Sequence, residues 1–367
     1  MSKLKVLVFV STLSSGGVAN VVINQVRACR DIDSSIVFDI ATNDGHSYPE
    51  RLQALFGSFY HVDRFSKSPI LYRKEVREVI VKSGCDAVHV HLGHLSWIIC
   101  QAAKELGVSS RVIQSHSELP RSNSLPFRLA MKIAPLLNQR YSTTRFAVSE
   151  GAGKAYFSGD FTFLPNIVDI SRIPLDRAVV KESYDEEFSI DSEKSLILGF
   201  AGLLDINKRP EIAIKVAERL NAMGIDCHLL IAGSGPRLSE LTELTSGSEI
   251  CTVLGQRNDA IELFSYIDVL LVPSIVEGMS LSILEAQLSG TACVVSDTIP
   301  SSNDLGLGSY RSASCDDIDS WAAAVIAFGK RSVLDNLSLA DRLKALEAIG
   351  YDDRSVARAL LNAFSGN

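Results

Sequence analysis

The sequence predicts an α/β protein with two parallel-sheet domains. Its 367 residues are too many for one ordinary domain and suit two cores of roughly 150 to 200 residues each. Apolar runs of strand length alternate with helical segments, and this alternation is typical of parallel strands joined by helical crossovers. The alternation stops once, around 170–195, where a polar and charged stretch contains no apolar run. We therefore expect two Rossmann-like domains that face a central cleft, with the ligand at the carboxyl ends of both sheets.

Each strand is expected where a short apolar run is bounded by polar or turn-forming residues. The first run, Lys5–Val10, leads through a glycine pair into an amphipathic helix over Val18–Arg30. A signal peptide also begins with basic and then apolar residues, but this run is β-branched and has no small-residue cleavage site, so a first strand is favoured. The expected strands are Lys5–Val10, Ile36–Ala41, Phe59–Val62, Ala87–Val90, Arg111–Gln114, Arg145–Val148, Phe161–Leu164, Leu196–Ala201, His228–Ala232, Ile250–Leu254, Val269–Val272 and Ala292–Val295.

Composition favours a packed cytoplasmic protein. Hydrophobic residues make up 46% of the chain, yet no apolar run approaches the roughly 18 uncharged residues that cross a bilayer. The seven cysteines are scattered, odd in number and form no Cys-x-x-Cys pair, which predicts reduced, buried thiols. The chain is acidic overall and has no basic patch with interleaved aromatic residues, so nucleic acid is not expected as a partner.

Positive charge is concentrated in the first half of the chain. Residues 1–170 carry 19 Lys and Arg against 14 Asp and Glu, whereas the rest carry 17 against 29. Basic residues also lie within and around the apolar segment 125–137: Arg121, Arg128, Lys132, Arg140 and Arg145. This segment is either an amphipathic helix that contacts an anionic membrane face or a lipid-linked acceptor, or a core helix with solvated cations on one side.

Two glutamates eight residues apart mark the main candidate site. Glu277 lies in the turn expected after the buried run Val269–Val272, and Glu285 lies on the helix expected over Ser280–Leu288. Two solvated surface residues would explain the pair equally simply, but the helix is largely apolar, and an acid in such surroundings needs a partner.

The start of that helix is suited to phosphate. The first N–H groups of a helix have no intrahelical partner and carry partial positive charge, so they bind a diphosphate without a metal. The candidate donors are the N–H groups of Gly278, Met279, Ser280 and Leu281. Glu277 would flank the group attached to the diphosphate, and Glu285 would accept hydrogen bonds from hydroxyls further along the ligand.

The segment that holds these glutamates resembles the E-x7-E signature of the retaining glycosyltransferases of family four, which have the GT-B fold. Other segments along the chain resemble motifs of the same family: Gly16–Val18, Leu164–Asp169, Gly199–Pro210, Leu230–Pro236 and Gly290–Asp297. The resemblance implies four parts of the chain: an acceptor-side domain over 1–170, a linker over 171–195, a nucleotide-sugar-binding domain over 196–350, and a C-terminal helix over 351–367 that returns to the first domain.

The resemblance also implies the reaction. A hexosyl or N-acetylhexosaminyl group moves from a nucleoside diphosphate, UDP above other carriers, to a glycan or lipid-linked acceptor in surface polysaccharide biosynthesis. Neither a metal nor a cofactor is implied. Glu277 would position the sugar hydroxyls, Lys208 would neutralise the diphosphate, and His116 would lie near the reacting hydroxyls. Further donor contacts are implied for Gly16, Gly17, Gly202, Gly233, Gly235, Arg257 and Glu285.

One position departs from the family pattern. Leu203 stands where the family has an arginine that acts together with the lysine, here Lys208. Loss of the bidentate guanidinium group costs a few kcal/mol of transition-state stabilisation. Either Arg209 partly substitutes, or the enzyme is slow, or the chain is a non-catalytic nucleotide-sugar-binding partner. A nucleotide-sugar epimerase has the same architecture, but the E-x7-E pattern argues against it.

Three histidines in the first half raise the question of a metal site. His89 and His91 share one face of an expected strand, and His94 follows. Metal sites commonly add carboxylate or cysteine ligands, and none is near in the sequence, so structural or acceptor-side roles are favoured. NAD is not expected, because the Gly16 loop lacks the G-x-G-x-x-G pattern.

Overall fold

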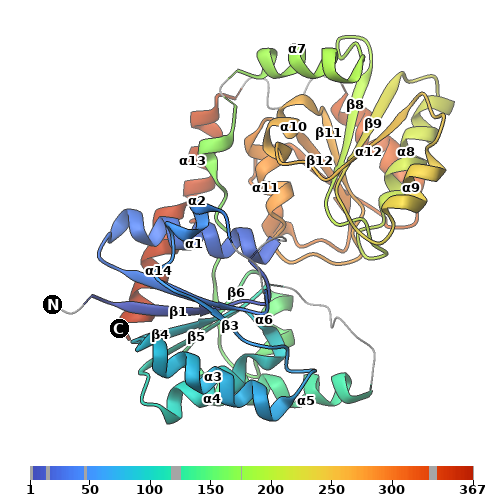
Figure 1. Ribbon diagram of the computed structural model, residues 1–367. Coiled ribbons are helices and arrows are strands. Elements are labelled where there is room, and N and C mark those ends of the chain that lie inside the picture. Colours follow the sequence, from blue (N-terminus) through green and yellow to red (C-terminus); the bar gives the residue numbers. More distant parts are fainter. Residues whose placement is uncertain are drawn as a thin grey trace. The chain divides into compact units, whose positions relative to one another are not determined.

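The protein, seen in a computed structural model, forms two compact units (Figure 1). The structure describes residues 3–13, 17–44, 48–116, 125–174, 176–329 and 337–366. Unit 1 comprises Met1–Val168 together with Gly350–Asn367, and unit 2 comprises Asp169–Ile349. Each unit has one parallel sheet between helices, so the predicted fold class is confirmed.

Unit 1 contains a seven-stranded parallel sheet in the order β3-β2-β1-β4-β5-β6-β7. Its strands are β1 (Lys5–Phe9), β2 (Val37–Thr42), β3 (Phe59–His61), β4 (Ala87–Val90), β5 (Ser110–Ser115), β6 (Thr144–Ala147) and β7 (Thr162–Phe163). Side chains alternate between the two faces of β1: Val6 and Val8 enter one core, and Leu7 and Phe9 enter another. Both faces of the sheet are therefore buried, which explains why β1 is a continuous apolar run.

Helices cover both faces of this sheet. Helices α3 and α4 pack together on one side, and α1 packs with α14 on the other (Figure 1). Thus the last helix of the chain completes the core of unit 1, with Leu360 and Phe364 beside Val22. The helical segments of unit 1 are α1 (Gly17–Ile32), α2 (Glu50–Gln53), α3 (Pro69–Ser83), η1 (Gly93–Leu95), α4 (Ser96–Glu105), α5 (Leu125–Tyr141), α6 (Glu150–Tyr156) and α14 (Asp353–Ser365).

Unit 2 repeats the same plan with six parallel strands in the order β10-β9-β8-β11-β12-β13. The strands are β8 (Leu196–Ala201), β9 (Cys227–Ala232), β10 (Cys251–Gly255), β11 (Val269–Val272), β12 (Ala292–Ser296) and β13 (Tyr310–Ala313). The helical segments are η2 (Ile170–Arg172), α7 (Arg177–Phe188), α8 (Pro210–Ala222), α9 (Leu238–Leu244), α10 (Ala260–Tyr266), α11 (Leu281–Leu288), η3 (Ser301–Asn303), α12 (Ile318–Phe328) and α13 (Leu339–Ala348).

In both sheets the strand order reverses once. Chain order runs outward from β1 through β2 to β3 and then restarts at β4 on the other side, and β8 and β11 have the same relation in unit 2. In an open parallel sheet, ligands bind outside the carboxyl ends of the strands at this switch point. Each unit therefore has one place where a ligand site is expected.

Two parts of unit 2 differ from the sequence prediction. Strand β13 was not expected, because two of its four side chains are exposed and it forms the edge of the sheet. Residues 171–195, expected as a linker, belong to unit 2 and include α7. Arg177 holds this helix in place by donating to the carbonyl oxygens of Ser265, Ile267 and Gly290 over 2.6, 2.7 and 2.9 Å.

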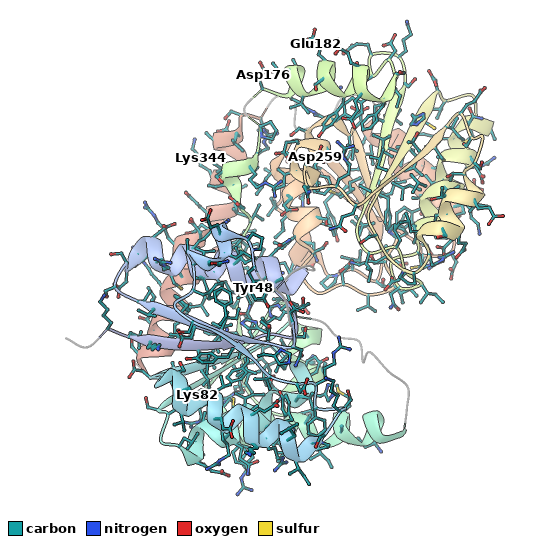
Figure 2. All side chains as sticks on the ribbon, viewed as in Figure 1. Tyr48, Lys82, Asp176, Glu182, Asp259 and Lys344 are labelled. Atoms are coloured by element: carbon teal, nitrogen blue, oxygen red, sulfur yellow. The ribbon has the colours of Figure 1, made fainter. Side chains whose placement is uncertain are left out.

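The burial pattern agrees with an ordinary packed interior. Tyr48 lies inside unit 1, whereas Lys82 and Glu182 point outward into solvent (Figure 2). The cysteines are free thiols, and all but the partly exposed Cys315 are buried, as predicted. Within the described ranges, no helix combines the length and the hydropathy needed to cross a bilayer.

Candidate functional site

The candidate site of unit 2 lies where adjacent strands β8 and β11 end. Because Val269 of β11 pairs with Leu198 of β8, the loops that follow these strands are neighbours. A backbone hydrogen bond joins them, from Ile275 N–H to the Asn207 carbonyl over 2.8 Å. The structure thus brings the segment 202–209 beside the segment 273–280, at the switch point of the sheet.

Lys208 and Glu277 form an ion pair at this point. Lys208 Nζ contacts Glu277 Oε1, and Ser274 Oγ donates to the same oxygen over 2.8 Å. The Asp205 carboxylate shapes the lysine loop, since it accepts the N–H groups of Asn207 and Lys208, each over 2.9 Å. The Glu277 side chain is 12% exposed and that of Lys208 is 30% exposed. A carboxylate for sugar hydroxyls and an ammonium for phosphate oxygens therefore lie in contact and are reachable by a ligand.

Helix α11 begins one residue later than expected, and this changes which amides are available. Ser280 N–H is not a free donor, because it donates to the Asn303 Oδ1 oxygen over 2.7 Å, while Asn303 Nδ2 donates to the Gly278 carbonyl over 2.9 Å. The prediction that Ser280 N–H holds phosphate is therefore wrong. The N–H groups of Leu281, Ser282 and Ile283 make no hydrogen bond to any described residue, so the donors lie in the first turn of the helix itself.

Glu285 lies one helical turn beyond Leu281, on the same face of α11. Its carboxyl group forms no hydrogen bond and no ion pair with the described part of the chain. The pKa of Glu285 is raised to about 7, mainly by burial; Arg172 opposes this rise, and repulsion from Asp169 adds to it. A half-buried carboxyl group without a partner among the described residues, beside free helix amides, can accept a hydrogen bond from a ligand hydroxyl. Its ionised and protonated forms are both populated near neutral pH.

Two of the predicted glycines hold loops together. An added Cβ on Gly233 would lie 1.9 Å from the Gly202 carbonyl oxygen, and one on Gly235 would lie 2.6 Å from the Leu204 carbonyl oxygen. These positions allow the loop after β9 to pack against the loop after β8, where Leu204 N–H donates to the Ser234 carbonyl over 2.9 Å. A Cβ on Gly202 itself would meet no atom within 4 Å, so this glycine borders open space.

Arg257 and Leu203 are placed differently from each other. The Arg257 guanidinium is engaged by Asp259 and Glu187 and lies over the ring of Tyr184, so it holds α7 rather than pointing at a free position. Leu203 is 51% exposed at the end of β8. Of the two glycines predicted in the first loop, Gly17 starts α1 and Gly16 lies outside the described residues.

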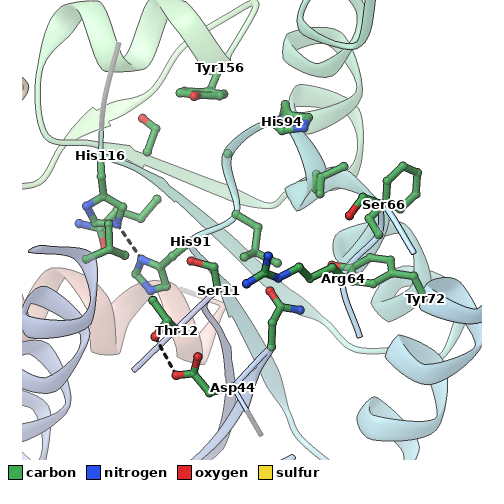
Figure 3. A pocket seen from close by; sticks show the side chains of 18 residues that line it. Ser11, Thr12, Asp44, Arg64, Ser66, Tyr72, His91, His94, His116 and Tyr156 are labelled. Atoms are coloured by element: carbon green, nitrogen blue, oxygen red, sulfur yellow. Dashed lines mark hydrogen bonds between the residues drawn. The ribbon is translucent and has the colours of Figure 1, made fainter. Parts of the chain in front are cut away.

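Unit 1 has its own pocket at its switch point, with a volume of about 630 Å³ (Figure 3). The pocket lies at the carboxyl ends of β1 to β5, and His116 lines it together with Ser11, Asp44, Arg64, His91 and Tyr156. His116 was predicted as a site residue and His91 was given a structural or acceptor-side role, whereas Ser11, Asp44, Arg64 and Tyr156 were not predicted. The position of a polar residue just after a strand was the available signal, and it applies to Ser11, Asp44 and His91.

Three histidines of unit 1, His89, His91 and His116, form a buried cluster. His91 Nδ1 and His116 Nε2 share a hydrogen bond of 2.8 Å, and the ring centroids of His89 and His91 lie 4.1 Å apart. Burial lowers the pKa of His89 to about 3 and of His116 to about 4, and it lowers the pKa of His91 well below its usual range. The three imidazoles are therefore neutral at physiological pH. No group of three His, Cys, Asp or Glu side chains suited to a metal occurs among the residues that the structure describes.

Comparison with known protein families supports this view of unit 2. A family model described as "Glycosyl transferases group 1" matches residues 181–325, the range that contains Lys208, Glu277 and Glu285. The chain is 29% identical to the putative glycosyltransferase EpsF of Bacillus subtilis, with 99% of this chain and 97% of that protein covered. It is also 29% identical to UDP-Gal:alpha-D-GlcNAc-diphosphoundecaprenol alpha-1,3-galactosyltransferase of Escherichia coli, but only over 48% of this chain and 46% of that one.

Solved structures share the architecture across the whole chain. Alr3699/HepE of Anabaena, crystallised with UDP and glucose, has a TM-score of 0.79 at 14% identity and covers 99% of both chains. A glycosyltransferase of Rickettsia africae has a TM-score of 0.78 at 15% identity and covers 100% of this chain and 98% of its own. At these identities the likeness establishes the fold, which is GT-B.

Proposed function

We propose that this chain moves a hexosyl or N-acetylhexosaminyl group from a nucleoside diphosphate, first of all UDP, to a glycan or lipid-linked acceptor; the match of residues 181–325 to the group 1 glycosyl transferases and the similarity to EpsF support this. The observation that carries the proposal is the contact between Lys208 and Glu277 beside the free amides of α11. A diphosphate needs compensating positive charge and a sugar needs hydrogen-bond acceptors, and this site offers both.

The proposed transfer retains the anomeric configuration. The bond between C1 of the sugar and the β-phosphate oxygen breaks, and a bond from C1 to the acceptor oxygen forms on the same face. The acceptor proton passes to the departing phosphate oxygen, so no protein base is required. Lys208 and the first-turn amides of α11 stabilise the charge that develops on the leaving group. Glu277 orients the sugar hydroxyls, and Glu285 accepts from the ribose.

No metal or cofactor is required in this scheme, because the diphosphate charge is compensated by an ammonium group and by helix amides. We place the reaction in surface polysaccharide biosynthesis at the cytoplasmic face of the membrane. The exposed side of α5 supports peripheral contact there: Ile133 and Leu136 are 53% and 61% exposed, and Lys132 and Arg140 are exposed beside them. The remaining basic residues proposed for this surface include Arg121, which lies outside the described residues.

The test is the release of UDP from a panel of UDP-sugars by purified protein, with GDP- and ADP-sugars alongside. Lys208→Met should lower kcat by roughly 100-fold, the scale of losing one transition-state donor. Lys215→Met, on the exposed face of α8, is the matched control and should stay near wild type. Turnover of no nucleotide sugar, or equal rates for Lys208→Met and wild type, would refute the proposal.

A second function is favoured by one residue. Leu203 is exposed where the family has an arginine, so the site has one cation fewer for the leaving group. The alternative is a nucleotide-sugar-binding partner without catalysis. It requires a rise in melting temperature with a nucleotide sugar and neither transfer nor donor hydrolysis.

A further inference from the structure

The pocket of unit 1 contains an uncompensated cation. The Arg64 guanidinium makes no hydrogen bond and no ion pair with the described residues, and it extends into the pocket toward Ser11 and His91 (Figure 3). Other exposed cations nearby are paired: Lys67, on the same loop, contacts Asp63 over 2.7 Å. A planar guanidinium left free at the wall of a concave pocket is suited to bidentate binding of an anion.

The one carboxylate named in this pocket does not neutralise Arg64. Asp44 Oδ2 accepts from Thr12 Oγ1 over 2.7 Å and from Leu13 N–H over 2.9 Å, so it is used to hold the loop after β1. It forms no ion pair with Arg64. Arg64 is therefore a charged group of this pocket that has no ion-pair partner among the described residues.

Several other residues of the pocket wall are polar and uncharged, beside apolar ones such as Phe65 and Leu92. His91 and His116 are neutral at physiological pH, since burial lowers the pKa of both. His91 is 7% exposed, and its Nε2 atom has no partner among the described residues. Ser11 adds a hydroxyl group. Groups of this kind bind sugar hydroxyls, and they leave Arg64 to select for charge.

We propose that the pocket of unit 1 binds an anionic acceptor, a sugar that carries a phosphate or a carboxylate, with Arg64 holding the anionic group and Ser11 and His91 contacting the sugar hydroxyls. This inference rests on the proposed transferase function and adds the chemical class of its acceptor. The phosphate belongs to a lipid-linked sugar diphosphate in one case, and the carboxylate to an acidic glycan in the other.

Binding of three probes to the full chain tests the inference by calorimetry: glucose 1-phosphate, glucuronic acid and glucose. At least one anionic probe should bind ten times more tightly than glucose, and this preference should weaken as salt rises. Arg64→Gln should lower the affinity for that probe about tenfold or more and leave glucose unaffected. Lys67→Gln removes a neighbouring but paired cation and should bind all probes as wild type does.

The outcomes distinguish the two kinds of anionic acceptor, and they also distinguish failure of the acceptor proposal from failure of the transferase proposal. A preference for glucose 1-phosphate assigns a lipid-linked diphosphate, and a preference for glucuronic acid assigns an acidic glycan. Equal affinity for all three probes, absence of binding, or an Arg64→Gln variant that binds as wild type would overturn the inference. So would a phosphate signal lost in Lys208→Met but not in Arg64→Gln, since it would belong to unit 2. UDP release from UDP-sugars in water, measured separately, reports the transferase function without an acceptor.

Discussion

Donor binding should depend on pH through Glu285. Burial raises the pKa of this carboxyl group to about 7, and no described residue donates a hydrogen bond to it. A ribose hydroxyl that donates to Glu285 stabilises the ionised form, so binding of the donor must lower the pKa and release a proton. A proton bound to Glu285 therefore competes with the ribose hydroxyl for the carboxylate. The affinity for the donor consequently rises with pH across neutrality.

The size of the effect follows from the titration of Glu285. With a pKa of about 7, about a tenth of the carboxyl groups are ionised at pH 6 and about nine-tenths at pH 8. If only the ionised form binds the ribose, affinity rises about tenfold over this interval, or about 1.4 kcal/mol. Stability has the opposite sign: the raised pKa stabilises the folded state below the ordinary pKa of 4.5, and this contribution is lost as the pH rises through about 7.

Calorimetric titration with a UDP-sugar at pH 6, 7 and 8 measures the affinity, and two buffers of different ionisation enthalpy measure proton release. The diphosphate of such a donor is a diester and does not titrate in this range. Glu285→Gln keeps the shape of the side chain and should abolish both the pH dependence and the proton release. Glu243→Gln, on the exposed face of α9, is the matched control. A wild-type affinity that is equal at pH 6 and pH 8, or a rise that persists in Glu285→Gln, would refute this reasoning.

Three further outcomes are expected. Leu203→Arg should raise kcat for UDP release about tenfold, because an exposed leucine is replaced by a charge-assisted donor; an unchanged rate would mean that position 203 does not reach the leaving group. Gly233→Ala should lower the free energy of unfolding by about 3 kcal/mol in urea titrations, since its Cβ would lie 1.9 Å from the Gly202 carbonyl oxygen, whereas Gly17→Ala meets no atom within 4 Å and should be tolerated. The lowered pKa of His116, about 4, keeps it neutral from pH 5 to 8, so His116→Gln should change turnover by the same factor throughout that range. Because the pKa of His116 is lowered, this residue contributes stability above pH 6.5, and that contribution is lost as the pH falls toward 4. The free energy of unfolding of His116→Gln should therefore fall less in acid than that of the wild type.

The strands were predictable from the sequence because burial on both faces of a parallel sheet leaves a continuous apolar run. Three strands have the expected bounds: Ala87–Val90, Leu196–Ala201 and Val269–Val272. Strand β13 was missed, because Arg311 and Ser312 are exposed at the sheet edge and no apolar run marks them. The pattern of apolar runs thus reports burial, and an edge strand is only partly buried.

Part of the candidate site was also predictable. Glu277 and Glu285 lie on one loop and helix, so their spacing in the sequence already defines their spacing in space. The ion pair between Glu277 and Lys208 joins residues 69 positions apart, and only the pairing of β8 with β11 brings them together.

Tertiary structure alone decided the chemistry of individual groups. Ser280 N–H is taken by Asn303, Glu285 has a raised pKa, and Arg64 stands unpaired in its pocket. Local sequence patterns determine which segments form helices and strands, because backbone hydrogen bonding and side-chain periodicity act between neighbours in the chain. Charge state, hydrogen-bond partners and free donors depend on groups that arrive from distant segments, so they are set only when the sheets have assembled.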